Sequence, residues 1–155
     1  MKKLIIIICL IIFLFSFNIK AMPYSTSPIG LWKTIDDSTG ELKSIVKIWL
    51  EHGKLIGKIK KIFPKPDEDQ NPKCDKCKGK RKDKPVLGMI FLWGFTPSDS
   101  KWKGGKILDP ENGKVYKCIL RVIDGGEKLK VFGYIRIIFK IGRTQTWLRA
   151  QESDL

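Results

Sequence analysis

Apolar and polar residues alternate along most of the chain, in short runs that end at clusters of turn residues. In the run at 128–134, Lys128 and Lys130 alternate with Leu129 and Val131. A period of two residues is typical of a β-strand with one face in the core and the other in water. Seven runs therefore predict strands, at 29–35, 44–50, 55–63, 102–108, 114–123, 128–134 and 141–149.

The connections between these runs predict the architecture. In the turn 109–113, Pro110 presets φ and the Asn112-Gly113 pair accepts positive φ. The glycine pair at 104–105 indicates a β-bulge or a sharp bend. A further apolar run at 86–95 fits either a buried strand or a short helix, because ten residues do not separate the two periods. About eight short strands, with turns roughly every ten residues, predict an all-β fold, a small antiparallel meander barrel.

One long segment, 64–85, breaks the strand pattern. It contains four prolines and the pair Cys74 and Cys77, so it cannot form a core strand. A loop of this length in a compact domain is usually functional or disordered. It is either an anion-binding flap at the mouth of the barrel or a solvated, mobile loop. Its basic residues are Lys73, Lys76, Lys78, Lys80, Arg81, Lys82 and Lys84.

The first residues predict export. Lys2 and Lys3 precede an apolar run at 4–17 that is shorter than the roughly 20 residues needed to span a bilayer. We expect a signal peptide at 1–21 with cleavage after Ala21, and the alternative is an uncleaved anchor. The predicted location is the periplasm, or outside the cell. After cleavage no membrane span is expected. The remaining chain divides into a flexible lead-in (22–28), a single barrel domain (29–150) and a short tail (151–155).

The net charge adds a class of partner. The 155-residue chain carries a formal charge of +14, which falls to +11 without Lys2, Lys3 and Lys20. A strongly basic exported domain favours anionic lipids, lipopolysaccharide phosphates or acidic glycans, and the export signal argues against nucleic acid. The opposing interpretation is that an AT-rich genome enriches lysine, which then only solvates the surface.

The first and last predicted strands carry residues that could close a barrel. Gly30-Leu31-Trp32 lies in the first strand, and Arg149 ends the last one. A closed sheet brings these strands together, so the guanidinium of Arg149 could stack on Trp32. This resembles the Gly-x-Trp and terminal arginine of lipocalins, in which the pair seals one end of the barrel.

The chain as a whole resembles the bacterial family catalogued as domain of unknown function 2147, whose members are small secreted proteins of Gram-negative bacteria. The most specific motifs are Gly-Gly-Lys-Ile-Leu-Asp-Pro-Glu-Asn-Gly-Lys at 104–114 and Gly-Arg-Thr-Gln-Thr-Trp-Leu-Arg at 142–149. One departure is Arg136, where the family pattern has glycine, which removes backbone freedom there. The resemblance implies a lipocalin-like β fold and brings no activity or catalytic residue. The similar stretches lie at 30–37, 54–59, 74–79, 85–88, 102–116 and 142–149.

The pair Cys74 and Cys77 is the motif with the most chemical potential, and several interpretations stay open. In an oxidising compartment the two could form a disulfide, or one could pair with Cys118. A zinc site needs four ligands, and Cys118 and His52 lie far away in the sequence. Redox catalysis would need a helix after the first cysteine, for which the lysine-rich sequence is poorly suited. No metal and no cofactor is predicted.

No catalytic constellation stands out elsewhere. His52 is the sole histidine and lies beside Gly53 in a predicted hairpin turn. The five tryptophans either line a ligand cavity or fill a small interior. We therefore predict a non-enzymatic binding module of the cell envelope, for a small apolar or amphipathic ligand or an anionic envelope component. The alternative is a thiol-redox or metal-handling protein that uses Cys74 and Cys77.

Overall fold

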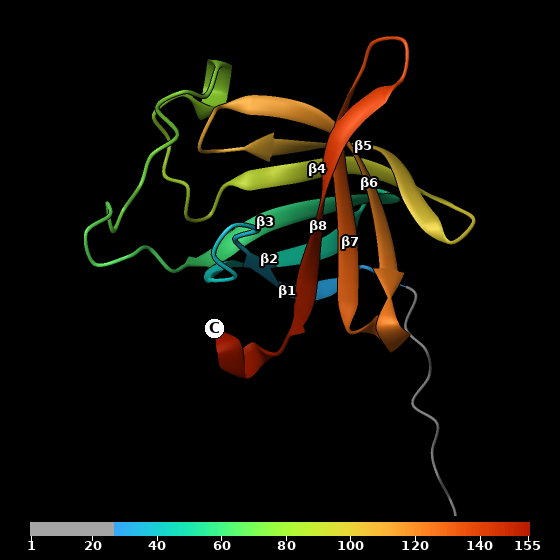
Figure 1. Ribbon diagram of the computed structural model, residues 1–155, viewed down its shortest axis with the longest axis horizontal. Helices are drawn as coiled ribbons and strands as arrows, with labels where there is room; N and C mark the ends of the chain where they lie inside the picture. Colours follow the sequence, from blue (N-terminus) through green and yellow to red (C-terminus); the bar gives the residue numbers. More distant parts are fainter. Residues whose placement is uncertain (1–26) are drawn as a thin grey trace, which may run out of the picture.

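The computed structural model describes residues 27–155, which form a closed antiparallel barrel of eight strands (Figure 1). The predicted signal peptide and most of the lead-in lie outside the described residues. Short 3-10 helices lie between the strands at Gly79–Arg81 and Asp124–Gly126 and after the last strand at Glu152–Asp154. The strands are β1 (Gly30–Ile35), β2 (Leu42–Glu51), β3 (Lys54–Ile62), β4 (Ile90–Ser98), β5 (Lys101–Asp109), β6 (Lys114–Ile123), β7 (Lys128–Arg136) and β8 (Lys140–Ala150).

Each strand pairs with the next in sequence, and β1 pairs with β8 to close the barrel. This confirms the predicted all-β meander barrel. For the apolar run at 86–95 the sequence predicts either a strand or a short helix. The structure has a strand there, but β4 begins only at Ile90. Residues 86–89 turn first, since Met89 donates its backbone N–H to the Val86 carbonyl oxygen at 3.1 Å and Gly88 has a φ of 84°.

The glycine pair in β5 produces an irregularity in the sheet. The register of β5 with β6 shifts between Trp102 and Gly105, which is the bulge that the sequence predicted. Any Cβ at Gly105 would overlap the ring of Phe95, which is fully buried. The absence of a side chain at Gly105 thus makes room for the ring of Phe95 from the neighbouring strand β4.

The inward-facing side chains fill the barrel. Trp32 and Trp147 are the largest fully buried side chains, and the Trp147 ring lies 6.0 Å from that of Phe91. Cys118 on β6 belongs to the same core. Two of the five tryptophans therefore pack the interior, whereas Trp49, Trp93 and Trp102 are half-buried.

The alternating strand directions give the barrel two distinct ends. At the closed end lie the start of β1, the end of β8 and the turns at 52–53, 99–100 and 124–127. At the other end lie the turns at 36–41, 110–113 and 137–139 and the long segment 64–89 between β3 and β4, which we call the lid. No helix among residues 27–155 has the length and apolar character needed to cross a bilayer.

Candidate functional site

The closed end is organised around Arg149. Its guanidinium carbon lies 3.8 Å from the centre of the Trp32 ring. Its nitrogens donate to the carbonyl oxygens of Gly126 (2.8 Å), Ile29 (2.9 Å) and Ser27 (3.3 Å). These bonds tie the end of β8 to the chain entering β1 and to the turn before β7. Burial lowers the pKa of the Arg149 guanidinium from its ordinary value, but arginine stays charged.

The local sequence makes this stacking possible. Gly30 has a φ of 127°, and a Cβ there would come within 3.0 Å of the Arg149 guanidinium. Trp32 anchors its indole by donating to the Pro28 carbonyl oxygen at 2.8 Å. The pairing of Trp32 with Arg149 in the β1–β8 register then places the cation over the ring. The contacts at this end are structural: they hold the end of β8 to the start of β1.

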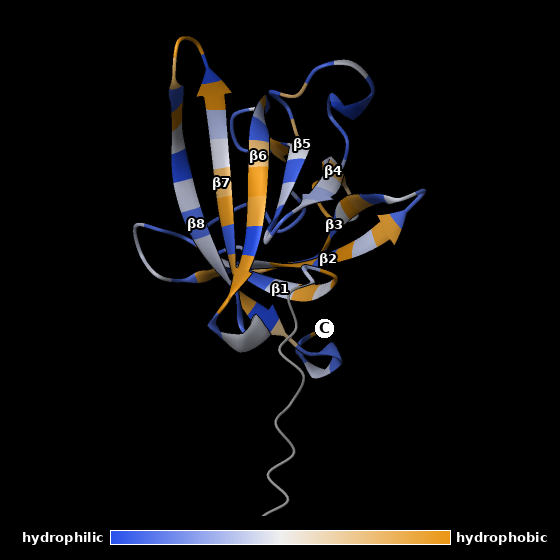
Figure 2. Cartoon of the chain, turned by 90° about the vertical axis from the view of Figure 1, so that its right-hand side faces the viewer, coloured by the Kyte–Doolittle hydropathy of each residue, from blue (hydrophilic) through white to orange (hydrophobic). Residues whose placement is uncertain are grey.

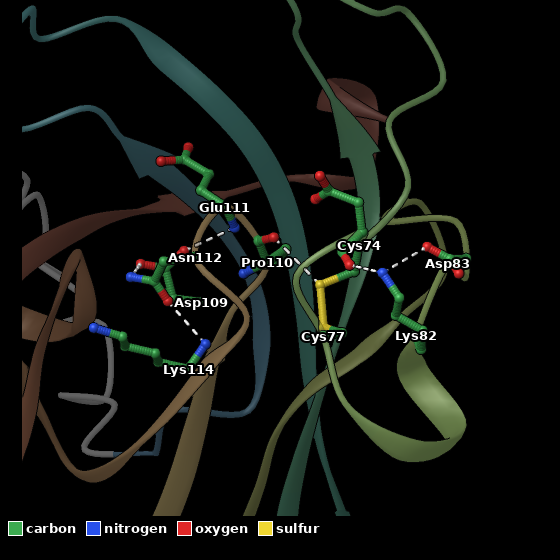
Figure 3. Close-up of a disulfide and its surroundings, with 10 residues drawn as sticks. Cys74, Cys77, Lys82, Asp83, Asp109, Pro110, Glu111, Asn112 and Lys114 are labelled. Atoms are coloured by element: carbon green, nitrogen blue, oxygen red, sulfur yellow. Dashed lines mark hydrogen bonds and ion pairs between the residues drawn. A yellow bond between two sulfur atoms is a disulfide. The ribbon is translucent and has the colours of Figure 1, made fainter.

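The lid covers the opposite end of the barrel, which we call the lid end. Cys74 and Cys77 form a disulfide, and their side chains are 0% and 3% exposed, within the core of the barrel (Figure 3). Cys74 also anchors the lid backbone, since its N–H donates to the Lys84 carbonyl oxygen at 2.9 Å and its carbonyl oxygen accepts from Asp83 at 3.0 Å. The lid therefore inserts a covalent crosslink into the mouth of the barrel, while most of its other residues are exposed.

The lid rests on the turn between β5 and β6 (Figure 3). Asp109 shapes this turn, since its carboxylate accepts from the Glu111 N–H at 2.9 Å and from the Asn112 amide at 2.8 Å. Gly113, with a φ of 69°, lies so close to the backbone of Lys76 that any Cβ would overlap it. The Cys74 sulfur lies 3.2 Å from the Pro110 carbonyl oxygen. The Asn-Gly turn thus forms a seat for the lid.

A recess of about 410 Å³ lies where the lid meets β6 and β7. Its wall combines apolar side chains from the strands with cations from the lid and from the start of β6. None of the described residues that line it is acidic. The lining residues are Cys77, Lys78, Arg81, Leu108, Gly113, Lys114, Val115, Tyr116 and Ile135.

A second recess, of about 360 Å³, also has Arg81 in its lining. Lys84, Leu87 and Met89 are among its lining residues. Arg81 is held in place because its guanidinium carbon lies 4.4 Å from the centre of the Trp93 ring on β4. A fixed arginine in the lining of both recesses can bind an anionic group with little loss of side-chain freedom.

The seven basic residues of the lid do not converge on one point. Lys78 and Arg81 line the larger recess, and Lys84 joins Arg81 at the smaller one. Lys82 pairs with Asp83 at 3.2 Å. The remaining three line neither recess and are exposed: Lys73, Lys76 and Lys80.

The sequence analysis missed the strand side of the larger recess. Lys114, Val115 and Tyr116 come from β6, and Ile135 comes from the end of β7. The one signal in the sequence is Val115, an apolar residue directly after a polar turn, which is 45% exposed. Which strand the lid covers depends on the path of the lid, and the alternation pattern does not encode that path.

The other candidate groups lie apart from the recesses. Cys118 is a free thiol of the described barrel, and burial raises its pKa to about 12. His52 lies exposed in the β2–β3 turn with a φ of 47°. Within residues 27–155, no group of three or more His, Cys, Asp and Glu side chains is placed to hold a metal ion.

Comparison with known proteins places the chain among bacterial proteins of this architecture. The family described as "Uncharacterized protein conserved in bacteria (DUF2147)" matches residues 30–149. A solved structure titled "Protein HP1028 from the human pathogen Helicobacter pylori belongs to the lipocalin family" matches with a TM-score of 0.69 and 20% sequence identity. The match covers 84% of this chain and 87% of that one, and shows a shared fold. No curated protein matches the chain.

Proposed function

The chain belongs to the bacterial family DUF2147 and has a lipocalin-like barrel, and from this premise we propose that it is a non-enzymatic binding module for a small amphipathic anion. The ligand would lie in the larger recess beside the lid rather than inside the barrel. The observation that carries this proposal is the recess itself, where cations of the lid face apolar side chains of β6 and β7.

The filled interior supports a site at the rim. Trp32, Trp147 and Phe95 are fully buried in the core of the barrel, and the Cys74–Cys77 disulfide plugs the mouth. A ligand within the barrel would have to displace these closely packed side chains, which costs several kcal/mol. The rim recess requires no such displacement, and its volume lies within the range of about 300–1,000 Å³ typical of small-molecule sites.

The lining residues indicate the class of ligand. Leu108, Val115 and Ile135 offer an apolar surface, while Lys78 of the lid and Lys114 of β6 add positive charge to the lining. An alkyl or aryl group would lie on the apolar wall. A carboxylate, phosphate or sulfonate would then pair with the cations, and Arg81 can form a bidentate pair with such a group.

The predicted signal peptide supports a location in the periplasm or outside the cell, where fatty acids, lipid fragments and acidic glycans supply ligands of this kind. The thiol-redox alternative is weaker. Cys74 and Cys77 are buried in the core beneath the outer surface of the lid to which they belong, and a redox disulfide must be accessible to its partner thiol.

The experiment is a titration with dodecanoate, followed by calorimetry and native mass spectrometry, on the chain starting at Met22. We expect one bound molecule per chain. The double variant Lys78→Glu, Lys114→Glu should weaken binding at least about tenfold, since it replaces two attractive charges with repulsive ones. Dodecanol, with the same chain and no charge, should bind more weakly than dodecanoate.

The matched control is the double variant Lys47→Glu, Lys103→Glu, which makes the same change in net charge at exposed positions on β2 and β5. It should bind dodecanoate with an affinity close to that of the unmodified chain. Equal weakening in both double variants would mean that overall charge drives binding, and the site would then not be the recess. Absence of binding to the unmodified chain would refute the proposal for this ligand class.

A further inference from the structure

The hairpin between β7 and β8 ends in an apolar tip, residues 135–141. It projects from the lid end of the barrel and is coloured as hydrophobic in Figure 2. The exposed fractions at its end are 73% for Ile137, 89% for Ile138 and 67% for Phe139. Ile135 and Ile141, which are about half exposed, form the second cross-strand pair below the turn. The most exposed apolar surface of the tip is therefore the turn 137–139 itself.

This composition is unusual for a hairpin turn. Such turns normally carry Gly, Asn, Asp or Pro, which suit the backbone and remain in water. These three consecutive large apolar residues do not stabilise the fold by burial, because they contact water rather than the core. Exposed apolar patches on soluble domains commonly mark contact with a membrane or another protein.

The basic residues beside the tip indicate that its partner carries negative charge. Arg136 and Lys140 form the last cross-strand pair below the turn. Neither has a carboxylate partner within residues 27–155. The whole stretch 128–150 contains six basic residues and no Asp or Glu. Lys140 also lies 4.9 Å from the centre of the Tyr134 ring, which holds the cation at the base of the tip.

We propose that the β7–β8 tip docks on an anionic lipid bilayer. Ile137, Ile138 and Phe139 enter the region between headgroups and acyl chains, and Arg136 and Lys140 pair with headgroup phosphates. An apolar end with uncompensated cations directly behind it is the arrangement that binds anionic membranes from the surface. The inference is independent of the recess and its ligand.

The shape and charge of the tip favour a bilayer over a second copy of the chain. Two tips meeting end to end would bring Arg136 and Lys140 of both copies together, and like charges repel. A bilayer offers negative charge around a soft apolar interior, which receives a convex projection without a preformed pocket. Docking would also bring the larger recess to the membrane surface, because Ile135 belongs to both the tip and the recess lining.

The experiment is co-sedimentation of the chain starting at Met22 with vesicles of phosphatidylcholine alone or mixed in equal parts with phosphatidylglycerol. We expect binding at least about tenfold tighter to the mixed vesicles. The variant Ile138→Ser, Phe139→Ser keeps the charge and should lose at least about tenfold in affinity. The variant Arg136→Gln, Lys140→Gln keeps the apolar tip and should lose the preference for phosphatidylglycerol.

Matched controls separate the tip from the rest of the surface. Leu50→Ser removes an apolar side chain that is 48% exposed on β2, and Lys47→Gln, Lys103→Gln removes two exposed cations elsewhere. Both should bind mixed vesicles as the unmodified chain does. All variants change exposed residues, so their urea midpoints should be unchanged, which verifies folding.

Three results would overturn the proposal. The first is unchanged vesicle binding by Ile138→Ser, Phe139→Ser. The second is equal weakening by the Lys47 and Lys103 control, which would assign binding to net charge. The third is a concentration-dependent dimer that these serine substitutions abolish, without any vesicle binding, which would make a second copy the occupant. Dodecanoate binding by the serine variant would report separately on the recess, since neither Ile138 nor Phe139 lines it.

Discussion

The two ends of the barrel are closed by different means. At the closed end, one side chain of β8, Arg149, stacks on Trp32 and donates to three carbonyl oxygens. At the other end, a folded lid lies over the mouth and is crosslinked by the Cys74–Cys77 disulfide. The contact of Arg149 with Trp32 depends on the pairing of β1 with β8, so it cannot change without opening the barrel. The second is an addition to a complete barrel, which leaves its outer edge available to form recesses.

The comparison predicts that the largest loss of stability follows from changes at the closed end. Arg149→Ala removes a stacked cation and three charged hydrogen bonds, and should lower the free energy of unfolding by about 3 kcal/mol. Urea denaturation measures the change. Arg149→Lys keeps the positive charge but loses the planar stacking and the multiple hydrogen bonds of the guanidinium. Its free energy of unfolding should therefore lie between those of Arg149→Ala and the unmodified chain. A loss below about 1 kcal/mol for Arg149→Ala would mean that this end is not held by arginine.

Removal of the disulfide should have the next largest effect, and it should be confined to the lid. Cys74→Ala, Cys77→Ala opens a short covalent loop, for which the chain-entropy relation gives about 2 kcal/mol. A reducing agent should raise hydrogen exchange in the lid of the unmodified chain and leave that of the variant unchanged. Hydrogen exchange should increase in the lid but not at Trp32. Equal increases at both ends would show that the lid and the barrel unfold as one unit.

The smallest expected effect is an acid weakening of the turn 36–41 at the lid end. The Asp36 carboxylate accepts from the backbone N–H groups of Thr39 and Ser38, and these bonds lower its pKa from 3.8 to about 2. A lowered pKa in the folded state stabilises the turn above about pH 4, and this contribution is lost as the pH falls through about 2. Hydrogen exchange at Ser38 and Thr39 should rise over that range.

The closed end provides the internal control for this pH effect, because the Arg149 guanidinium does not titrate there. Asp36→Asn should make exchange at Ser38 and Thr39 independent of pH between about 4 and 2, apart from the intrinsic chemical rate. A pH dependence that persists in Asp36→Asn would assign the effect to another carboxylate.

The sequence predicted the fold well because its signals are local. Period-two alternation and turn residues act over a few positions, so the β6 range of 114–123 agrees with the structure. The apolar run at 86–95 did not agree with the bounds of β4, which begins at Ile90, because Val86 to Met89 are apolar for a different reason. They lie at the end of the lid, where Met89 is 7% exposed, and they turn before β4 begins, with Ile59 of β3 accepting a backbone hydrogen bond from Gly88 and donating one to Met89.

The candidate site was less predictable because it depends on contacts between distant segments. The lysine-rich lid is visible in the sequence, but its seat on Gly113 is not, since an Asn-Gly turn has the same pattern whether or not a backbone packs on it. Tyr116 and Ile135 alternate like any strand residues. They become part of the recess only because the lid passes beside them.

The pairing of β1 with β8 also has a consequence for the order of folding. Every other strand pairs with its sequence neighbour, whereas the bond from Arg149 to the Ile29 carbonyl oxygen joins residues 120 positions apart. Local hairpins close short loops at low entropic cost, and contacts between the chain ends form late. A chain that emerges from its N-terminus can therefore build seven strands as an open sheet, and it becomes a barrel only when the last strand arrives.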